Sequence, residues 1–238
     1  MCGIIACIGN DNIVTYLLNG LERLQNRGYD SAGYSIFLDG FIITRKYSQS
    51  ESIDIIKKLK QFEGNDNKSC IGIGHTRWAT HGAINSTNSH PHESYDRKFT
   101  IVHNGIIENY KSLKAELVKQ GVTFTSQTDS EVIVNMIAYL HTSLRCSIEQ
   151  AIDKTIERLE GTYGIAIMCK DTPNTLYCIR RGSPLLIGIN DTCAFVTSEQ
   201  SGFNGNVNNY FELNNLDLCR IHLENGDLKL ETGDTYTK

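Results

Sequence analysis

The second residue of the chain is a cysteine that could act as a self-contained nucleophile. Removal of Met1 would leave the thiol and a free α-amine on Cys2. An α-amine has a pKa of about 7.7 to 8.0, so part of it is unprotonated at neutral pH and can accept the thiol proton. The resulting thiolate is the nucleophilic form of cysteine. Taken alone, Cys2 also fits a small packing residue at the start of a buried strand, because Ile4 and Ile5 follow it.

A polar and aromatic run over residues 74–82 follows an apolar segment and is a candidate binding loop. Its Arg77 carries the planar guanidinium that binds a carboxylate through two hydrogen bonds, although a single arginine is more commonly part of a surface ion pair. Trp78 is the only tryptophan of the chain. Tryptophan usually anchors a core, but the polar neighbours of Trp78 are as consistent with a loop or lid.

Three further polar segments contain candidate functional residues. Asn104 and Gly105 follow an apolar strand, and an amide with a neighbouring backbone N–H can stabilise an oxyanion in acyl transfer. Taken alone, the same Asn-Gly dipeptide predicts a turn. Asp129 precedes a helical pattern, so it either caps that helix or binds a substrate ammonium group. Arg27 and Asp30 lie between the first helix and the next strand, where they could pair with each other.

The histidines raise the question of a metal site. Five of the seven histidines lie between His75 and His103. Their spacing matches no recognised zinc motif, and no cluster of carboxylates accompanies them. The glycines at 72 and 74 lack the third glycine and the helix of a phosphate-binding loop. The sequence therefore predicts neither a metal nor a cofactor.

Length and composition exclude several classes of protein. The chain has 238 residues, of which 40% are hydrophobic and 21% charged, with a net charge of −4. Such a chain is typical of a globular domain and has no basic excess for nucleic acid. No apolar stretch approaches the length of a membrane span, and no secretory signal is evident. We therefore expect a cytoplasmic protein that binds neither nucleic acid nor membrane, and in which seven of the eight cysteines are reduced packing residues.

Hydrophobic periodicity predicts strands at both ends of the chain and helices between them. Helices are expected from residue 13 to near Gly28 and over 53–61, 110–120, 130–140 and 148–159. Strands are expected over 2–8, 32–38, 41–47, 70–76, 99–104, 165–169, 176–179, 185–189, 194–197, 210–213 and 218–223. The dipeptide Asp39-Gly40 is typical of a tight hairpin turn. This order of elements indicates an α+β layered domain over residues 2–238, with no internal linker.

Six motifs in order identify a family. They are Cys2-Gly-Ile4, Arg27-Gly-Tyr-Asp-Ser-Ala-Gly33, His75-Thr-Arg-Trp-Ala-Thr-His-Gly82, His90-Pro-His92, His103-Asn-Gly-Ile-Ile-Glu-Asn109 and Thr128-Asp-Ser-Glu131. Over essentially its whole length the chain resembles the glutaminase domain of glutamine:fructose-6-phosphate aminotransferases, also called glucosamine-6-phosphate synthases, which are class II glutamine amidotransferases. The resemblance implies an N-terminal-nucleophile hydrolase fold, a four-layer αββα sandwich of two antiparallel sheets between helical layers.

The resemblance also implies the catalytic roles. Cys2 would attack the side-chain amide of L-glutamine, and its own α-amine would act as base and then as acid toward the departing ammonia. Asn104 and the Gly105 N–H would form the oxyanion hole, and Arg27 would help to order the N-terminus. The implied reaction is hydrolysis of glutamine to glutamate and ammonia through a thioester on Cys2.

Recognition of the substrate is implied in the same way. Arg77 would bind the α-carboxylate of glutamine and Asp129 its α-ammonium group. Thr80 and His81 would complete the pocket, and Trp78 would lie on a closing loop. A zwitterionic amino acid requires one cation and one anion in its site, so these implied roles agree with the residue types.

The same family implies partners and leaves alternatives. Its full-length enzymes carry a C-terminal sugar-isomerase domain that consumes the ammonia, and we expect that domain to be absent from this chain, which ends at Lys238. A homo-oligomer is compatible with the sequence. One alternative is a different amidotransferase or amide hydrolase with an N-terminal cysteine. Another is a catalytically silent module that only senses glutamine.

Overall fold

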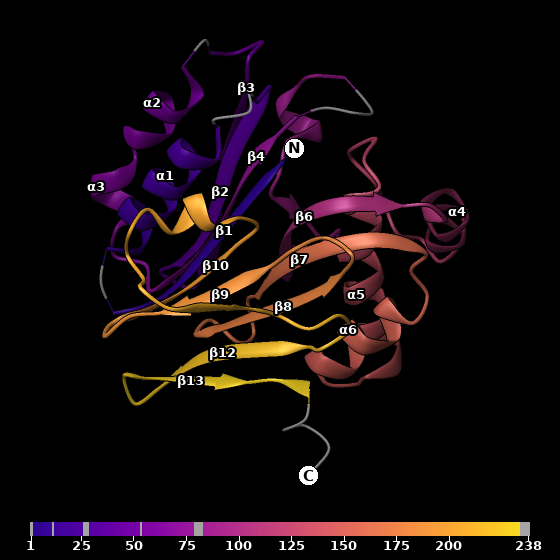
Figure 1. Cartoon of the computed structure of the whole chain (residues 1–238). Coiled ribbons are helices and arrows are strands. Elements are labelled where there is room, and N and C mark those ends of the chain that lie inside the picture. The colour runs from indigo at the N-terminus through magenta and orange to yellow at the C-terminus, as the bar shows by residue number, and fades with distance from the viewer. Residues whose placement is uncertain (1, 11, 26–28, 53, 79–82, 234–238) are drawn as a thin grey trace.

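Two antiparallel sheets pack face to face at the centre of the molecule (Figure 1). The computed structural model describes residues 2–10, 12–25, 29–52, 54–78 and 83–233. The seven-stranded sheet has the order β11 (Tyr210–Glu212), β9 (Leu186–Ile189), β10 (Cys193–Thr197), β1 (Gly3–Gly9), β4 (Ile71–Arg77), β2 (Ser31–Leu38) and β3 (Phe41–Ser48). The six-stranded sheet has the order β13 (Asp227–Glu231), β12 (Cys219–Glu224), β8 (Thr175–Arg181), β7 (Gly161–Cys169), β6 (Phe99–Ile107) and β5 (His92–Glu93).

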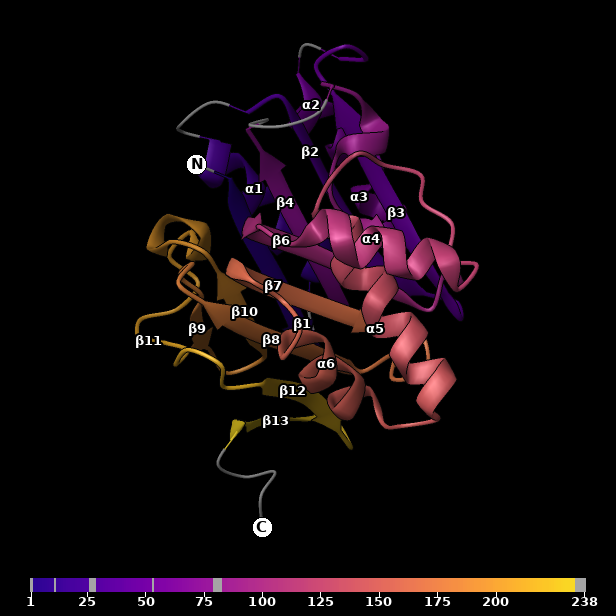
Figure 2. The ribbon, with the colours of Figure 1, turned by 90° about the vertical axis from the view of Figure 1, so that its right-hand side faces the viewer.

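Helices cover the two outer faces (Figures 1 and 2). The seven-stranded sheet is covered by α1 (Ile13–Leu24), α2 (Ile55–Lys60) and α3 (Glu63–Asp66). The six-stranded sheet is covered by α4 (Tyr110–Lys119), α5 (Ser130–Leu144) and α6 (Ile148–Ile156). Among the described residues, short 3₁₀ helices span Ser86–Asn88 and Gln200–Phe203. The predicted four-layer αββα arrangement is confirmed.

Three hydrophobic cores separate the four layers. Alternate side chains of a strand point to opposite faces, so β1 contributes Ile4, Ala6 and Ile8 to the core between the sheets. Its Ile5 and Cys7 contribute to the core beneath α1 and α2. The third core lies between the six-stranded sheet and α4 to α6. Burial on both faces explains why the inner strands read as continuous apolar runs in the sequence.

The expected helices and strands are present, with shifts at their ends. The hairpin turn at Asp39-Gly40 is confirmed, with φ of 51° and 85° at its two residues. Two strands were not predicted, β5 and β13. β5 has only two residues, and β13 is a short edge strand, so neither shows a strong hydrophobic pattern. The expected strand 99–104 continues to Ile107 as β6, which places Asn104 and Gly105 inside a strand.

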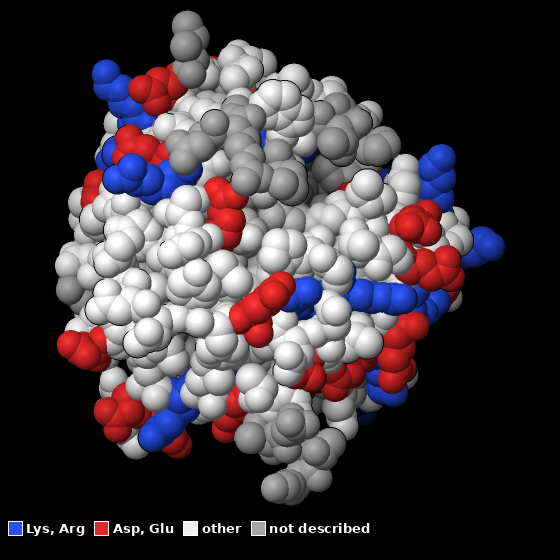
Figure 3. Space-filling model, in the orientation of Figure 1, with Lys and Arg blue, Asp and Glu red and all other residues white. Residues whose placement is uncertain are grey.

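Surface and covalent features agree with the composition. On the face shown in Figure 3, acidic and basic side chains are intermixed around a largely uncharged centre. All eight cysteines are free. Within the described part of the chain, no helix combines the length and apolar character that crossing a bilayer requires.

Candidate active site

Cys2 lies immediately before β1, beside the end of β4. The two strands pair in a register that places Gly3 opposite Thr76. The backbone N–H of Trp78 donates a hydrogen bond to Cys2 Sγ at 3.3 Å, and Sγ lies 3.6 Å from the Trp78 carbonyl oxygen. On the other side of β1, Ser198 Oγ accepts a hydrogen bond from the Ile4 N–H at 2.9 Å. The thiol is therefore held at the start of β1 and the end of β4.

The surroundings of Cys2 keep its thiol protonated. Burial raises the pKa of the Cys2 thiol above its ordinary value, and the Asp30 carboxylate acts in the same direction. The hydrogen bond with the Trp78 backbone and the charge of Arg77 lower that pKa, but by less. Attack by Cys2 therefore requires a base. The α-amine that removal of Met1 would expose lies on the same residue as the thiol.

Asn104 and Gly105 lie side by side in β6, so the alternative of a turn is wrong. They pair with Gly164 and Tyr163 of β7 in the ladder of the six-stranded sheet. Gly105 has φ of 133°, and a Cβ at this position would clash with the Thr162 carbonyl oxygen, so only glycine fits. The amide nitrogen of Asn104 donates to the Cys2 carbonyl oxygen at 2.9 Å. Tertiary structure thus brings a candidate oxyanion donor against the candidate nucleophile.

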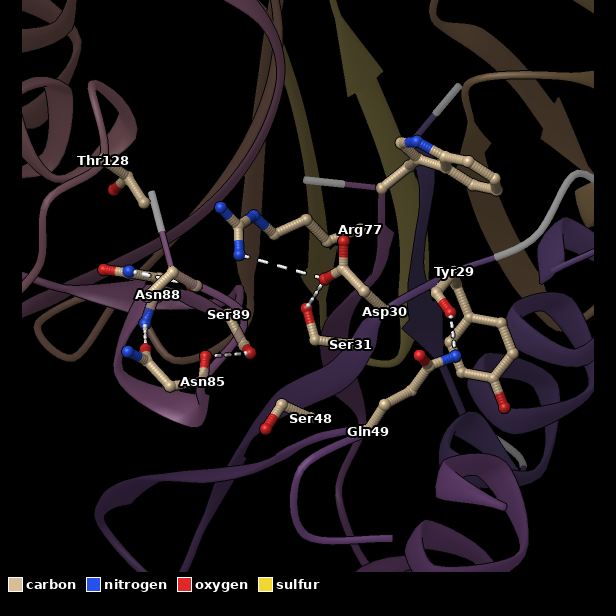
Figure 4. Close-up of polar contacts among 12 residues, drawn as sticks. Tyr29, Asp30, Ser31, Ser48, Gln49, Arg77, Asn85, Asn88, Ser89 and Thr128 are labelled. Carbon is tan, nitrogen blue, oxygen red and sulfur yellow. Dashed lines mark hydrogen bonds and ion pairs between the residues drawn. The ribbon is translucent and has the colours of Figure 1, made fainter. Parts of the chain in front are cut away.

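Arg77, the last residue of β4, is buried beside Asp30. Its Nη1 lies 3.9 Å from Asp30 Oδ1, and Ser31 Oγ donates to the same carboxylate oxygen at 3.0 Å (Figure 4). The Asp30 N–H donates to the Arg77 carbonyl oxygen at 2.8 Å. Arg77 is only 5% exposed, so the surface ion pair considered from sequence is wrong. Arg27, the sequence-based partner of Asp30, lies outside the described residues.

Asp129 precedes α5 but does not cap it. Its side chain makes no capping hydrogen bond. Instead Oδ2 accepts a hydrogen bond from the Ile107 N–H at 2.8 Å. This contact joins the start of α5 to the end of β6, and it directs a carboxylate to the cavity beside Asn104. The helix-cap alternative is therefore wrong as well.

A cavity of about 120 Å³ contains most of the candidate residues. Its lining includes Cys2, Arg77, Trp78, Asn104, Gly105 and Asp129, together with His90, His103, Ile106, Ile107, Tyr110, Gln127, Thr128 and Ser130. Trp78 is 50% exposed at this cavity, which agrees with a loop position and not with a core anchor. Thr80 and His81 lie outside the described residues.

Sequence reasoning missed several lining residues, among them Tyr110 and Gln127. The only feature of the sequence that could have indicated them is that each lies next to one of the six motifs. Neither has a residue type or spacing that indicates chemistry by itself.

Four of the histidines form a buried cluster, of which His90 and His103 line the cavity and His75 and His92 do not. His75 and His90 stack with ring centroids 4.1 Å apart, and His90 contacts His92 edge-on at 4.5 Å. Ser130 Oγ lies 2.9 Å from both His90 Nε2 and His103 Nδ1. Burial lowers the pKa of His75 to about 3 and those of His90 and His92 well below the ordinary range. Among the described residues, no three His, Cys, Asp or Glu side chains are grouped to hold a metal ion.

Comparison with known proteins shows which family the sequence matches. Residues 75–205 match the family described as "Glutamine amidotransferase domain". Glutamine--fructose-6-phosphate aminotransferase (isomerizing) of Staphylococcus epidermidis is 38% identical over 242 residues, covering 100% of this chain and 39% of that protein. The protein of the same name from Fusobacterium nucleatum is 40% identical over 241 residues, covering 100% of this chain and 36% of its own length. The chain thus spans less than two-fifths of these curated relatives.

A solved structure supports the same assignment. The structure of glutamine phosphoribosylpyrophosphate amidotransferase from B. subtilis, complexed with ADP and GMP, matches with a TM-score of 0.78 and 25% sequence identity. The match covers 97% of this chain and 49% of that chain. This likeness confirms the N-terminal-nucleophile fold implied by the sequence motifs.

Proposed function

Because the chain belongs to the glutamine amidotransferase domain family, we propose that it hydrolyses L-glutamine to L-glutamate and ammonia at Cys2. The observation that carries the proposal is the single cavity that contains the Cys2 thiol, the Asn104 amide, the Arg77 guanidinium and the Asp129 carboxylate. A nucleophile, an oxyanion donor, a cation and an anion are what hydrolysis of a zwitterionic amide requires.

The reaction follows from the positions of these groups. After Met1 is removed, the Cys2 α-amine takes the Sγ proton, and the thiolate attacks the side-chain carbonyl carbon of glutamine. The negative charge that develops on the oxygen is stabilised by Asn104 Nδ2 and the Gly105 N–H. Return of the proton to the leaving nitrogen releases ammonia and leaves a thioester. Water then attacks the thioester and restores the thiol.

Substrate selection rests on two opposite charges. Arg77, positioned by Asp30, binds the α-carboxylate of glutamine, and Asp129 binds the α-ammonium group. Thr80 and His81 complete the pocket, Trp78 lies on a loop that closes over it, and Arg27 orders the N-terminus. These last four roles are carried over from the resemblance of the sequence motifs.

The ammonia is proposed to serve glucosamine 6-phosphate synthesis from fructose 6-phosphate. Both aminotransferase relatives are named for fructose 6-phosphate, and they are more similar to this chain than the phosphoribosylpyrophosphate amidotransferase, at 38% and 40% against 25% identity. In this proposal residues 2–238 form the glutaminase domain of a cytoplasmic enzyme. Its partner is a sugar-isomerase domain like the one that the relatives' printed name "isomerizing" indicates.

The test of the proposal is release of ammonia from glutamine by the purified chain, with intact mass measured on the same sample. We expect activity only in protein that begins at Cys2, and none from Cys2→Ala. Cys70→Ala is the matched control, since Cys70 is half-buried and lies outside the cavity. Activity of protein that retains Met1, or of Cys2→Ala, would contradict the assignment of the nucleophile.

Two substrate experiments separate the alternatives. Asparagine should be a poor substrate because its shorter side chain shifts both charges relative to the thiol, and simple acyl amides should be poor substrates because they lack both charges. A glutamine analogue with a diazoketone in place of the carboxamide should add covalently to Cys2. A chain that binds glutamine but neither reacts with this analogue nor releases ammonia would be a sensor and not an enzyme.

A further inference from the structure

The orientation of the Asn104 amide decides whether it can serve an oxyanion. A side-chain amide has a donating and an accepting end, and rotation by half a turn exchanges them. The nitrogen of Asn104 carries two hydrogens, one of which is donated to the Cys2 carbonyl oxygen at 2.9 Å. The second hydrogen is available to a reacting group beside Cys2. The opposite orientation would present an oxygen to the developing negative charge.

The other end of the amide contacts His75. Asn104 Oδ1 lies 2.9 Å from His75 Nε2. Because an amide oxygen only accepts, His75 must carry its proton on Nε2. His75 lies in β4 of the seven-stranded sheet and Asn104 in β6 of the six-stranded sheet, and both views place these strands next to each other (Figures 1 and 2). The hydrogen bond therefore connects the two sheets at the cavity.

We propose that His75 is a positioning residue that holds the donating end of the Asn104 amide toward the thiol-bearing residue. The proposal rests on the glutaminase function proposed above. His75 does not line the cavity, so it has no direct part in the proposed reaction. His75 acts only through Asn104.

The rest of the cluster restrains His75. The His90 ring stacks on the His75 ring at a centroid distance of 4.1 Å and an interplanar angle of 35°. His90 Nε2 is in turn hydrogen-bonded to Ser130 Oγ, at the first residue of α5. Ser130 follows Asp129, so the same chain of contacts links the oxyanion donor to the segment proposed to bind the substrate ammonium group. His75 is 1% exposed, and burial keeps its pKa near 3, so it stays neutral at working pH.

Two substitutions of His75 separate donation from packing. His75→Gln retains an N–H that can reach Asn104 Oδ1, whereas His75→Met has a comparable length and no donor. For His75→Met we expect kcat to fall about 10- to 100-fold with KM within about twofold, a loss below the 10² to 10³ typical of deleting the donor itself. His75→Gln should stay within about threefold of the original kcat. His141→Met is the matched control, because His141 lies on α5 outside the cavity lining, hydrogen-bonded to the Cys146 carbonyl oxygen and edge-on to the Phe99 ring.

A double-mutant cycle tests whether His75 acts through Asn104. In the Asn104→Ala background, His75→Met should cost less than about twofold in kcat, because the amide to be oriented is gone. Equal losses in both backgrounds would overturn the proposal. An equal loss of kcat in His75→Gln and His75→Met would also overturn it.

A measurement without activity separates this inference from the proposed function. In protein with ¹⁵N-labelled histidine, the His75 signal, identified by its loss in His75→Gln, should report a neutral ring protonated at Nε2 between pH 8 and 6. A ring protonated at Nδ1, or a charged ring, would overturn the proposal. If the intact chain releases no ammonia from glutamine but shows the Nε2–H form, the proposed function fails while the role of His75 in orienting Asn104 stands.

Discussion

Two of the four Asn-Gly dipeptides of the chain lie within a strand or directly join two paired strands, and the structure uses these two in opposite ways. Asn225-Gly226 connects β12 to β13, with φ of 52° and 89°, as in a two-residue hairpin turn. Asn104-Gly105 continues a strand and lines the cavity beside Cys2. The alternative reading of Asn104-Gly105 as a turn suits Asn225-Gly226 instead. Sequence reasoning predicted neither the turn at Asn225-Gly226 nor strand β13 after it.

Neighbours in space explain the difference. A Cβ on Gly226 would meet no atom within 4 Å, so only its own backbone angle requires glycine. A Cβ on Gly105 would clash with the Thr162 carbonyl oxygen on β7. Likewise the Asn104 side chain has partners at Cys2, just before β1, and at His75 on β4. A dipeptide therefore permits a conformation, and contacts distant in sequence select it. The following predictions test this contrast between the cavity and the hairpin.

The largest effects are expected at the two charges of the cavity. Removing one member of a desolvated charge pair costs about 2 to 5 kcal/mol, so Arg77→Ala or Asp129→Asn should lower kcat/KM roughly 30-fold to several thousand-fold. The amide oxygen that Asp129→Asn introduces can still accept from the Ile107 N–H, so the local backbone is retained. Asp227→Asn beside the hairpin turn is the control and should leave kcat/KM unchanged.

Glutamine analogues sharpen this prediction. The unmodified chain should discriminate against glutamine amidated at its α-carboxyl group, and Arg77→Ala should lose most of that discrimination. Asp129→Asn should instead lose discrimination against an analogue without the α-amine. If both variants keep full discrimination against both analogues, the substrate charges are bound elsewhere.

The next largest effect is expected from substitution of Asn104, in contrast to Asn225. Asn104→Ala should lower kcat by about 10² to 10³ with little change in KM, because an oxyanion donor acts mainly in the transition state. Asn225→Ala should leave both kinetic constants unchanged and reduce stability by about 1 kcal/mol, since asparagine tolerates a positive φ better than alanine. Steady-state kinetics and urea unfolding measure the two effects. A loss that appears only in KM would remove Asn104 from the oxyanion hole.

The two glycines should differ in stability. Gly105→Ala combines a positive φ with a clash against the β7 backbone, so we expect a loss of about 2 to 4 kcal/mol in the free energy of unfolding. Gly226→Ala has only the unfavourable φ, and a loss of about 1 kcal/mol is expected. Urea unfolding of both variants checks this. Similar losses at the two positions would mean that the Thr162 contact is easily relieved.

The buried histidines predict acid sensitivity. Burial lowers the folded-state pKa of His75 to about 3 and that of His90 well below its ordinary range, so the unfolded chain binds more protons below about pH 6.5. Stability is therefore fully present above that pH and falls as pH decreases, by about 1.4 kcal/mol per pH unit for each such histidine. The groups facing His90 are His75, His92, His103 and Lys46, each of which lowers its pKa further.

Variants assign this pH dependence to the cluster. Between pH 6.5 and 5.5, His90→Gln should reduce the slope of unfolding free energy against pH by about one proton. Urea unfolding at each pH gives the slopes. An unchanged slope in His90→Gln would show that His90 is protonated in the folded protein.

Local pattern in the sequence was sufficient for much of the architecture. Alternating and continuous apolar runs predicted most strands, helical spacing predicted α1, α4, α5 and α6, and the Asp39-Gly40 turn was identified from its residue types. These features depend on residues close in sequence, which share one element and one buried face. The candidate nucleophile and the opposite charges of Arg77 and Asp129 could also be found from the sequence, because each lies in a distinctive motif.

Only the tertiary structure decided how those residues meet. Asp30 contacts Arg77 across 47 positions, Asn104 contacts Cys2 across 102, and His75 reaches Asn104 from the other sheet. Gly105 has to be a glycine because the Thr162 carbonyl oxygen lies beside it, and no local sequence pattern reveals that neighbour. The physical reason is that residue type sets which hydrogen bonds and charges a side chain can offer. The packing of two sheets sets which partners it finds.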